Sequence, residues 1–223
     1  MAYSRPVLAA IFDMDGLLID SEPLWDRAEM DVFSTLDIDL TRRNELPDTL
    51  GLRIDQTVRM WHDTLPWSGP SQEEVTQRII ARALNLVEES RPLLPGVEQA
   101  LRLCKAEGLK IGLASASPLH MLERVLEMFN LRNYFDTVVS AEALPYSKPH
   151  PQVYLDAAAR LGVDPLNCVT LEDSFNGMIA TKAARMRSIV IPAKEHAEDA
   201  RWALANVKLS SLTELTSTDL HGK

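Results

Sequence analysis

Two carboxylates, Asp13 and Asp15, stand two positions apart at the end of an apolar run and directly before Gly16. The run, residues 7–12, is apolar at every position, which is typical of a parallel strand buried on both faces. Residues i and i+2 of a strand point the same way, so both carboxyl groups can converge on one site. An Asp-Gly turn with a solvated neighbouring carboxylate would give the same short pattern. The complete run up to Ser21 is much rarer and favours a functional site.

Three further segments place polar groups where strands are expected to end. Ser115 and Ala116 follow an apolar run and precede a helix, whose first amides favour an anion. Lys148 stands at the start of another expected helix, and Asp173 follows an apolar run together with Glu172. Taken singly, the serine and the acidic pair could cap helices and the lysine could be solvated. Together they place an acid, a hydroxyl, a cation and a metal-binding carboxylate at one sheet edge, where open α/β folds bind ligands.

With these segments the sequence resembles the haloacid-dehalogenase-like phosphohydrolases. The matching motifs are Asp13-Met14-Asp15-Gly16-Leu17, the strand that ends in Ser115, Lys148-Pro149, and Glu172-Asp173. The resemblance spans nearly the whole chain, and within the superfamily it is strongest to bacterial 2-deoxyglucose-6-phosphate and hexitol phosphatases. It implies a phosphoric monoester hydrolase that acts on small sugar or sugar-alcohol phosphates.

The resemblance also implies a role for each site residue. Asp13 would attack phosphorus as the nucleophile and form an aspartyl-phosphate, and Asp15 would be the general acid and base. Mg²⁺ is the implied cofactor, held by the side chains of Asp13 and Asp173 and by the backbone carbonyl of Asp15. Glu172 is expected to support these ligands without binding the metal, or to bind it only occasionally. The residues implied to bind the substrate are Asp13, Asp15, Ser115, Ala116 and Lys148. Covalent catalysis would divide a very high barrier, since enzymes accelerate some phosphate monoester hydrolyses about 10²¹-fold.

Four alternative functions fit parts of the sequence, and a particular feature argues against each. A dehalogenase expels a halide without a proton, so Asp15 would have no task. Phosphonate hydrolases of this superfamily use a lysine of the cap, and residues 21–89 contain no lysine. β-Phosphoglucomutases carry a histidine shortly after the first motif, where this chain has Trp25, which cannot accept a proton. A non-enzymatic phospho-acceptor receiver module would need no large helical insertion.

Two residues of the insertion are candidates for substrate contact. Trp25 either fills the interior of the insertion or stacks on a sugar ring. Arg53 follows Gly51-Leu52 at a helix start, where it could reach a substrate. Both roles depend on how the insertion lies over the sheet.

Alternating helix and strand patterns predict an α/β fold: a doubly wound, parallel, five-stranded Rossmann-like sheet with a small helical cap inserted after the first strand. After the strand at residues 7–12, further strands are expected at 109–114, 136–140, 168–171 and 188–191. A short edge strand near 207–209 is left open. Residues 1–20 and 89–223 are assigned to the core domain and residues 21–88 to the cap. Within the cap, Ser71 and Glu74 form a capping box at a helix start.

The amino-acid composition limits the classes of binding partner that this protein can have. The 223 residues, 46% of them hydrophobic, suffice to bury a substantial core. A net charge of −9 without a Lys/Arg cluster argues against nucleic acid, so phosphate binding needs positive charge concentrated locally. No segment is long and apolar enough for a membrane span, and Cys104 and Cys168 sit among apolar residues, as reduced thiols do. We expect a cytoplasmic monomer that acts on a small phosphorylated molecule, with no nucleic-acid or membrane partner.

Overall fold

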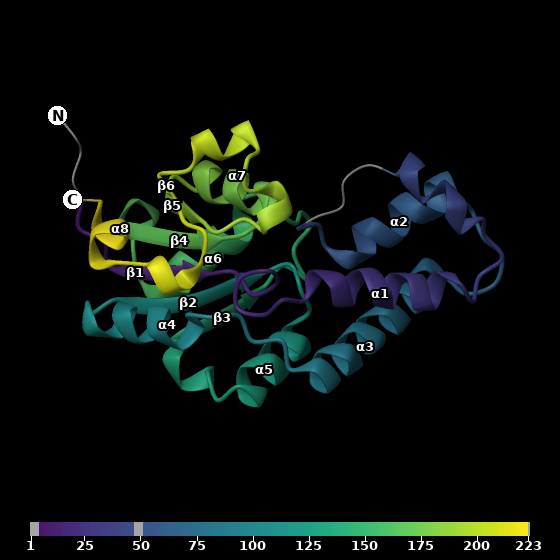
Figure 1. The fold of residues 1–223 in the computed structure, drawn as a ribbon, viewed down its shortest axis with the longest axis horizontal. Coiled ribbons are helices and arrows are strands. Elements are labelled where there is room, and N and C mark those ends of the chain that lie inside the picture. The colour runs from purple at the N-terminus through teal and green to yellow at the C-terminus, as the bar shows by residue number, and fades with distance from the viewer. Residues whose placement is uncertain (1–4, 47–50, 223) are drawn as a thin grey trace.

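The computed structural model describes residues 5–46 and 51–222. Within these residues the strands form one parallel sheet of six strands in the order β3-β2-β1-β4-β5-β6 (Figure 1). The strands are β1 (Ala9–Phe12), β2 (Lys110–Ser115), β3 (Thr137–Ser140), β4 (Cys168–Glu172), β5 (Arg187–Val190) and β6 (Val207–Lys208). Because β1 lies between β2 and β4, the residues that follow it reach the centre of the sheet edge.

The predicted number of five strands was wrong by one. β6 contains only two residues, and it pairs parallel with β5, Val207 beside Ile189 and Lys208 beside Val190. Two residues are too few for a period-2 hydrophobic pattern to stand out, so the sequence could indicate this strand only as an open option. The parallel α/β class is confirmed.

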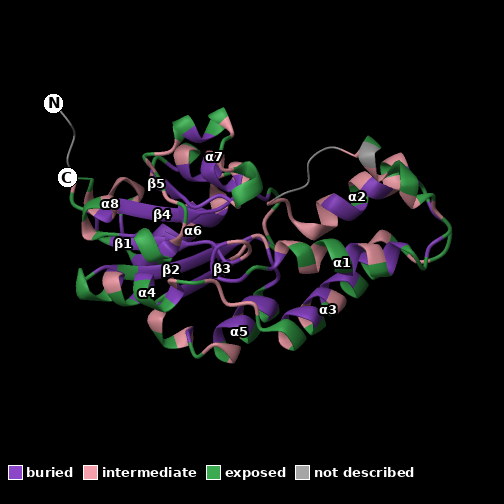
Figure 2. Ribbon diagram, viewed as in Figure 1, coloured by how far each residue is buried: buried purple, intermediate pink, exposed green. Residues whose placement is uncertain are grey.

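Helices cover both faces of the sheet, as a doubly wound fold requires (Figures 1 and 2). One face carries α4 (Val97–Ala106), α5 (Leu119–Met128) and α8 (Ser217–His221), and the other carries α6 (Gln152–Leu161) and α7 (Phe175–Ala183). The side chains of β1 alternate between the two hydrophobic layers: Ala10 and Phe12 join one, Ala9 and Ile11 the other. All four are fully buried, which explains why this run is apolar at every position.

Three helices, α1 (Glu22–Phe33), α2 (Ile54–Thr64) and α3 (Gln72–Ser90), lie to one side of the sheet (Figure 1). They pack around a hydrophobic cluster of their own, in which the Phe33 and Trp61 rings stack with centroids 4.4 Å apart. The predicted capping box is confirmed: the Glu74 amide donates to Ser71 Oγ, and the Ser71 amide donates to the Glu74 carboxylate. We refer to these helices as the cap. Their helix ends differ slightly from residues 21–88, and the domain boundaries stay a prediction.

The two cysteines are buried free thiols in opposite layers, Cys104 on α4 and Cys168 at the start of β4. Burial raises the pKa of each thiol to about 12, so both stay protonated. Among the described helices, none is both long and apolar enough to cross a membrane.

Candidate active site

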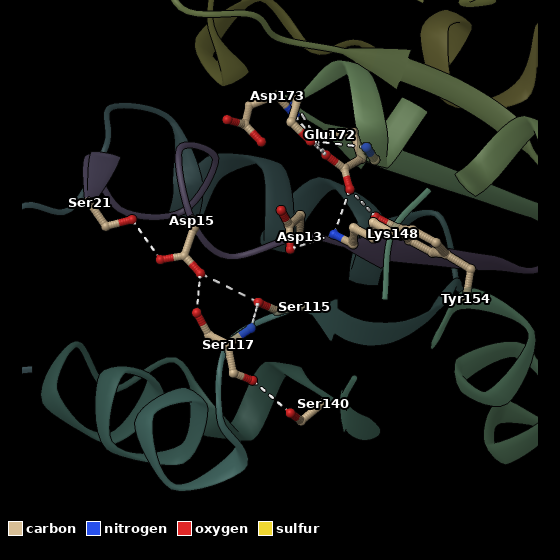
Figure 3. A network of polar contacts seen from close by, with 12 residues as sticks. Asp13, Asp15, Ser21, Ser115, Ser117, Ser140, Lys148, Tyr154, Glu172 and Asp173 are labelled. Carbon is tan, nitrogen blue, oxygen red and sulfur yellow. Dashed lines mark hydrogen bonds and ion pairs between the residues drawn. The ribbon is translucent and has the colours of Figure 1, made fainter. Parts of the chain in front are cut away.

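The carboxyl ends of β1 and β4 bring three acidic side chains together (Figure 3). Asp13 follows β1 directly, and its amide donates to the carbonyl of Leu171 on β4 at 3.0 Å, so the strand pairing extends to Asp13 itself. Asp13, Glu172 and Asp173 offer carboxylate oxygens that all lie within 4.8 Å of one another, and all three residues are buried. Three carboxylates in a place so poor in water require positive charge beside them.

Lys148 supplies part of that charge. Its Nζ lies 2.9 Å from Asp13 Oδ1 and 2.6 Å from Glu172 Oε1, and its side chain is 1% exposed. Burial alone would lower the pKa of Lys148, but attraction to the two carboxylates outweighs it and raises the pKa above its usual value. The lysine therefore stays charged, and its alternative interpretation as a solvated surface residue is wrong.

Glu172 holds this lysine in place. Its Oε1 accepts hydrogen bonds from Lys148 Nζ and from the Tyr154 hydroxyl. Its Oε2 accepts from the amides of Asp173 and Ser174 and from Ser174 Oγ, at 3.2–3.3 Å. Gly177 packs against the carboxylate so closely that a Cβ there would lie 1.9 Å from Oε1. Since protein donors contact both oxygens, Glu172 is suited to fixing Lys148.

Asp173 has a buried Oδ1 without a hydrogen-bond partner in the described structure. Burial, reinforced by Glu172 and Asp13, raises the pKa of Asp173 well above its usual value. Burial also raises the pKa of Asp13 to about 7, against the attraction of Lys148. A hard divalent cation would satisfy the unpartnered oxygen and offset the remaining negative charge, so this donor set fits Mg²⁺. The absence of a side chain at Gly16 leaves space beside the Asp173 carboxylate, because a Cβ there would lie 2.0 Å from Asp173 Oδ2.

Asp15 has a separate set of neutral donors. Its Oδ1 accepts from Ser21 Oγ at 2.7 Å and from Trp25 Nε1 at 2.9 Å. Its Oδ2 accepts from Ser117 Oγ at 2.6 Å and, at a longer 3.4 Å, from Ser115 Oγ. In Figure 3 one oxygen of the carboxylate points toward Ser115 and Ser117 and the other toward Ser21, away from Lys148. Two carboxylates in such different surroundings can take different roles, one as nucleophile and the other in proton transfer.

A cavity of 1160 Å³ lies between the sheet edge and the cap. Its core side carries all of the site residues proposed from the sequence: Asp13, Asp15, Ser115, Ala116, Lys148 and Asp173. Its cap side includes Trp25, Glu29, Arg43, Thr57 and Trp61. Burial raises the pKa of Glu29 to about 7, so near neutral pH this carboxyl group can either donate or accept a hydrogen bond. Such walls suit a small polar molecule, and Lys148 and Arg43 supply positive charge among mainly acidic neighbours.

Comparison with known proteins decides the family. Residues 7–185 match the family model of haloacid dehalogenase-like hydrolases. The chain belongs to this family. Hexitol phosphatase B of Escherichia coli K12 is 71% identical to this hydrolase over 222 residues, covering 100% of both chains. A phosphorylated carbohydrates phosphatase of Thermotoga maritima is 33% identical over 81% of this chain and 83% of its own.

Solved structures share the fold of this hydrolase. CbbY of Rhodobacter sphaeroides, in complex with phosphate, gives a TM-score of 0.85 at 26% identity, over 96% of this chain and 99% of its own. A β-phosphoglucomutase of Clostridium difficile gives 0.78 at 27% identity, over 95% and 94%. Because the fold includes a mutase, it does not by itself select hydrolysis, and the site must do so.

Arg53 does not contribute to the described walls of the hydrolase's cavity. Its guanidinium donates to the carbonyls of Ala141 and Leu144, at 2.8 and 2.6 Å, and pairs with Asp55 at 2.5 Å. The interpretation of Arg53 as a substrate contact is therefore wrong: it ties the start of α2 to the loop after β3. Its carbonyl partners lie 88 and 91 positions away, and no sequence pattern marks a backbone acceptor at such a distance.

Three supporting residues of the site were not predicted. Ser117, two positions after Ser115, binds Asp15, and the only signal for it is a second hydroxyl in the loop between strand and helix. Tyr154 binds Glu172 from within an apolar helix face, where an aromatic residue normally indicates core packing. For Trp25 the sequence predicts packing or stacking on a sugar ring, and its hydrogen bond to Asp15 carries no sequence signal.

Proposed function

We propose that this hydrolase is a Mg²⁺-dependent phosphatase of small sugar or sugar-alcohol phosphates, with an aspartyl-phosphate intermediate on Asp13. The observation that carries the proposal is the buried pair of Asp13 and Lys148, 2.9 Å apart, beside the unpartnered oxygen of Asp173. An anionic nucleophile can approach an anionic phosphate only where positive charge is concentrated. The 71% identity to hexitol phosphatase B supports the substrate class.

In the first step Asp13 attacks phosphorus and the bond to the sugar oxygen breaks, while Asp15 gives a proton to that departing oxygen. In the second step Asp15 takes a proton from a water molecule that attacks phosphorus, and Asp13 is released together with inorganic phosphate. Lys148 and the loop of Ser115 and Ala116 stabilise the phosphoryl oxygens in both steps. Charge stabilisation of the phosphoryl group, with the nucleophile held in line, accounts for most of such catalysis.

The side chains of Asp13 and Asp173 and the backbone carbonyl of Asp15 would hold the metal. When bound, Mg²⁺ supplies charge stabilisation to the phosphoryl oxygens. The unpartnered Asp173 oxygen and the absence of a side chain at Gly16 support this assignment.

Asp173→Asn should weaken Mg²⁺ binding by more than the roughly 10–100-fold that follows loss of an outer-shell partner, because a neutral amide replaces a charged ligand. Calorimetric titration of the substrate-free protein with Mg²⁺ measures this directly, and the Mg²⁺ concentration for half-maximal phosphate release should rise with it. Asp63→Asn, at an exposed position on α2, is the matched control and should change neither value. Unaltered Mg²⁺ affinity in Asp173→Asn would remove this residue from the metal site.

The substrate class is tested by phosphate release from a panel of hexitol phosphates, hexose 6-phosphates, 2-deoxyglucose 6-phosphate and a phosphoserine peptide. Each is measured with Mg²⁺ and with a chelator. We expect many turnovers on the sugar and polyol phosphates with Mg²⁺, little activity with the chelator, and little on the peptide. Failure to turn over any sugar or polyol phosphate would contradict the proposal. A single phosphorylation without turnover would instead support a receiver module.

A mutase of the β-phosphoglucomutase type is the second candidate, since it shares the fold at a TM-score of 0.78. A mutase returns the phosphoryl group to another sugar hydroxyl, which requires a base beside that hydroxyl. Trp25 stands at the position of the mutase histidine, and its indole only donates. We therefore expect inorganic phosphate as the product. Sugar bisphosphate together with isomerisation faster than phosphate release would overturn this choice.

We also propose that the enzyme is cytoplasmic and monomeric, with no nucleic-acid or membrane partner. The two buried free thiols support a reducing compartment. The net charge of −9 argues against a polyanionic partner.

A further inference from the structure

Trp25 on α1 uses its one polar group on Asp15. The indole Nε1 donates to Asp15 Oδ1 at 2.9 Å, and the ring lines the cavity. Trp25 is a residue of the first cap helix, whereas Asp15 follows the central strand of the core. The contact therefore joins the cap directly to the carboxylate assigned to proton transfer.

The partners of the two Asp15 oxygens differ in what they can do. Oδ1 accepts from Ser21 and from an indole N–H, which is a donor only. Oδ2 faces the hydroxyls of Ser117 and Ser115, and a hydroxyl can turn from donating to accepting. If Oδ1 carried a proton, that proton and the indole N–H would be two donors facing each other with no acceptor between them. Oδ2 can carry a proton without losing its partners.

We propose that Trp25 is a positioning residue for Asp15: its indole N–H keeps Oδ1 an acceptor in both protonation states, so that Oδ2 carries the proton transferred in catalysis. In the first step this proton passes from Oδ2 to the sugar oxygen as its bond to phosphorus breaks. In the second step the Asp15 carboxylate recovers a proton, on Oδ2, from the water that attacks phosphorus. The proposal rests on the assignment of Asp15 as general acid and base.

The indole differs from the serine donors because it belongs to a helix of the cap. Ser115 is the last residue of β2 and Ser117 lies in the core loop that follows it, whereas Ser21 precedes the first residue of α1. Trp25 lies one helical turn further on, so its distance to Asp15 depends on how the cap sits over the core.

Trp25→Phe tests the proposal, because it removes the N–H and keeps an aromatic ring. We expect kcat/KM on a hexitol phosphate to fall about 10–100-fold, the scale of losing a hydrogen bond to a charged group. On p-nitrophenyl phosphate, whose leaving group needs no proton, the loss should be no more than a fewfold. Trp67→Phe is the matched control: it removes an indole N–H that donates to the Pro70 carbonyl elsewhere in the cap, and neither substrate should respond.

A double mutant separates positioning from packing. If Trp25 acts through Asp15, Trp25→Phe should cost little more in an Asp15→Asn background than Asp15→Asn alone. Thermal unfolding of each variant shows that it is folded. Equal losses on both substrates, or full additivity in the double mutant, would overturn the role of Trp25 while leaving the phosphatase assignment intact. The assignment of Asp15 as the general acid and base fails instead if Asp15→Asn itself lacks leaving-group selectivity.

Discussion

Asp13→Asn should abolish turnover, with a loss of at least about 10⁶-fold, the scale seen when an enzyme loses its nucleophile. A neutral amide cannot form the acyl phosphate, and the carboxylates of Glu172 and Asp15 are engaged by other partners. Glu172 is held by Lys148 and Tyr154, and Asp15 is held by Ser21, Trp25 and Ser117. Phosphate release measures the loss, and mass spectrometry of the acid-quenched wild type should find phosphate on Asp13. A phosphoryl group trapped on another residue would contradict the assignment.

The same substitution should leave the fold intact and stabilise it in the absence of metal. The pKa of Asp13 is raised by burial from 3.8 to about 7, so ionising this group costs more in the folded state than in the unfolded chain. This cost to the stability of the folded protein is fully present above pH 7 and shrinks as the pH falls toward 4. It is absent at lower pH, where Asp13 is protonated in both the folded and the unfolded chain. The gain in unfolding temperature of Asp13→Asn over wild type should follow this course. A variant less stable than wild type at pH 8 would show instead that the ion pair with Lys148 dominates.

The core and the main site residues could be predicted because short-range patterns encode them. The apolar run of β1 predicts a central strand, and parallel strands end at a common edge, so Asp13, Ser115 and Asp173 had to lie close together. The place of Lys148 was harder to predict, because no residue next to it in the sequence distinguishes a buried lysine from a solvated one. Only its coincidence with the other three segments indicated a cation at the site, and the ion pair with Asp13 is seen only in the structure.

Cap contacts could not be predicted, because they depend on how two packed units meet. Arg53 has the right chemistry for phosphate, yet its donors go to the carbonyls of Ala141 and Leu144. Trp25 has the pattern of a core residue, yet its N–H reaches Asp15. Both outcomes are set by the orientation of the cap over the sheet, and a sequence periodicity describes only the face that each helix buries.

Asp15→Asn should lower kcat/KM on hexitol and other alkyl phosphates by about 10²–10⁴, the usual contribution of general acid–base catalysis. The structure makes this an unusually selective change. The amide oxygen can replace Oδ1 as acceptor for Ser21 and Trp25, and the amide NH₂ can donate to the hydroxyls of Ser117 and Ser115. Geometry is thereby kept while the transferable proton is lost.

The loss should depend on the leaving group and on the step. With p-nitrophenyl phosphate the first step needs no acid, so Asp15→Asn should form the aspartyl-phosphate readily and then hydrolyse it slowly for want of a base. Stopped-flow absorbance should show a burst of p-nitrophenolate close to one equivalent per enzyme, followed by slow turnover. Asp20→Asn, which removes a charge from the cavity wall, is the control and should show neither the burst nor the leaving-group selectivity. Equal losses on alkyl and aryl phosphates without a burst would exclude Asp15 as the acid and base, because a residue that only shaped the pocket would slow both substrates alike.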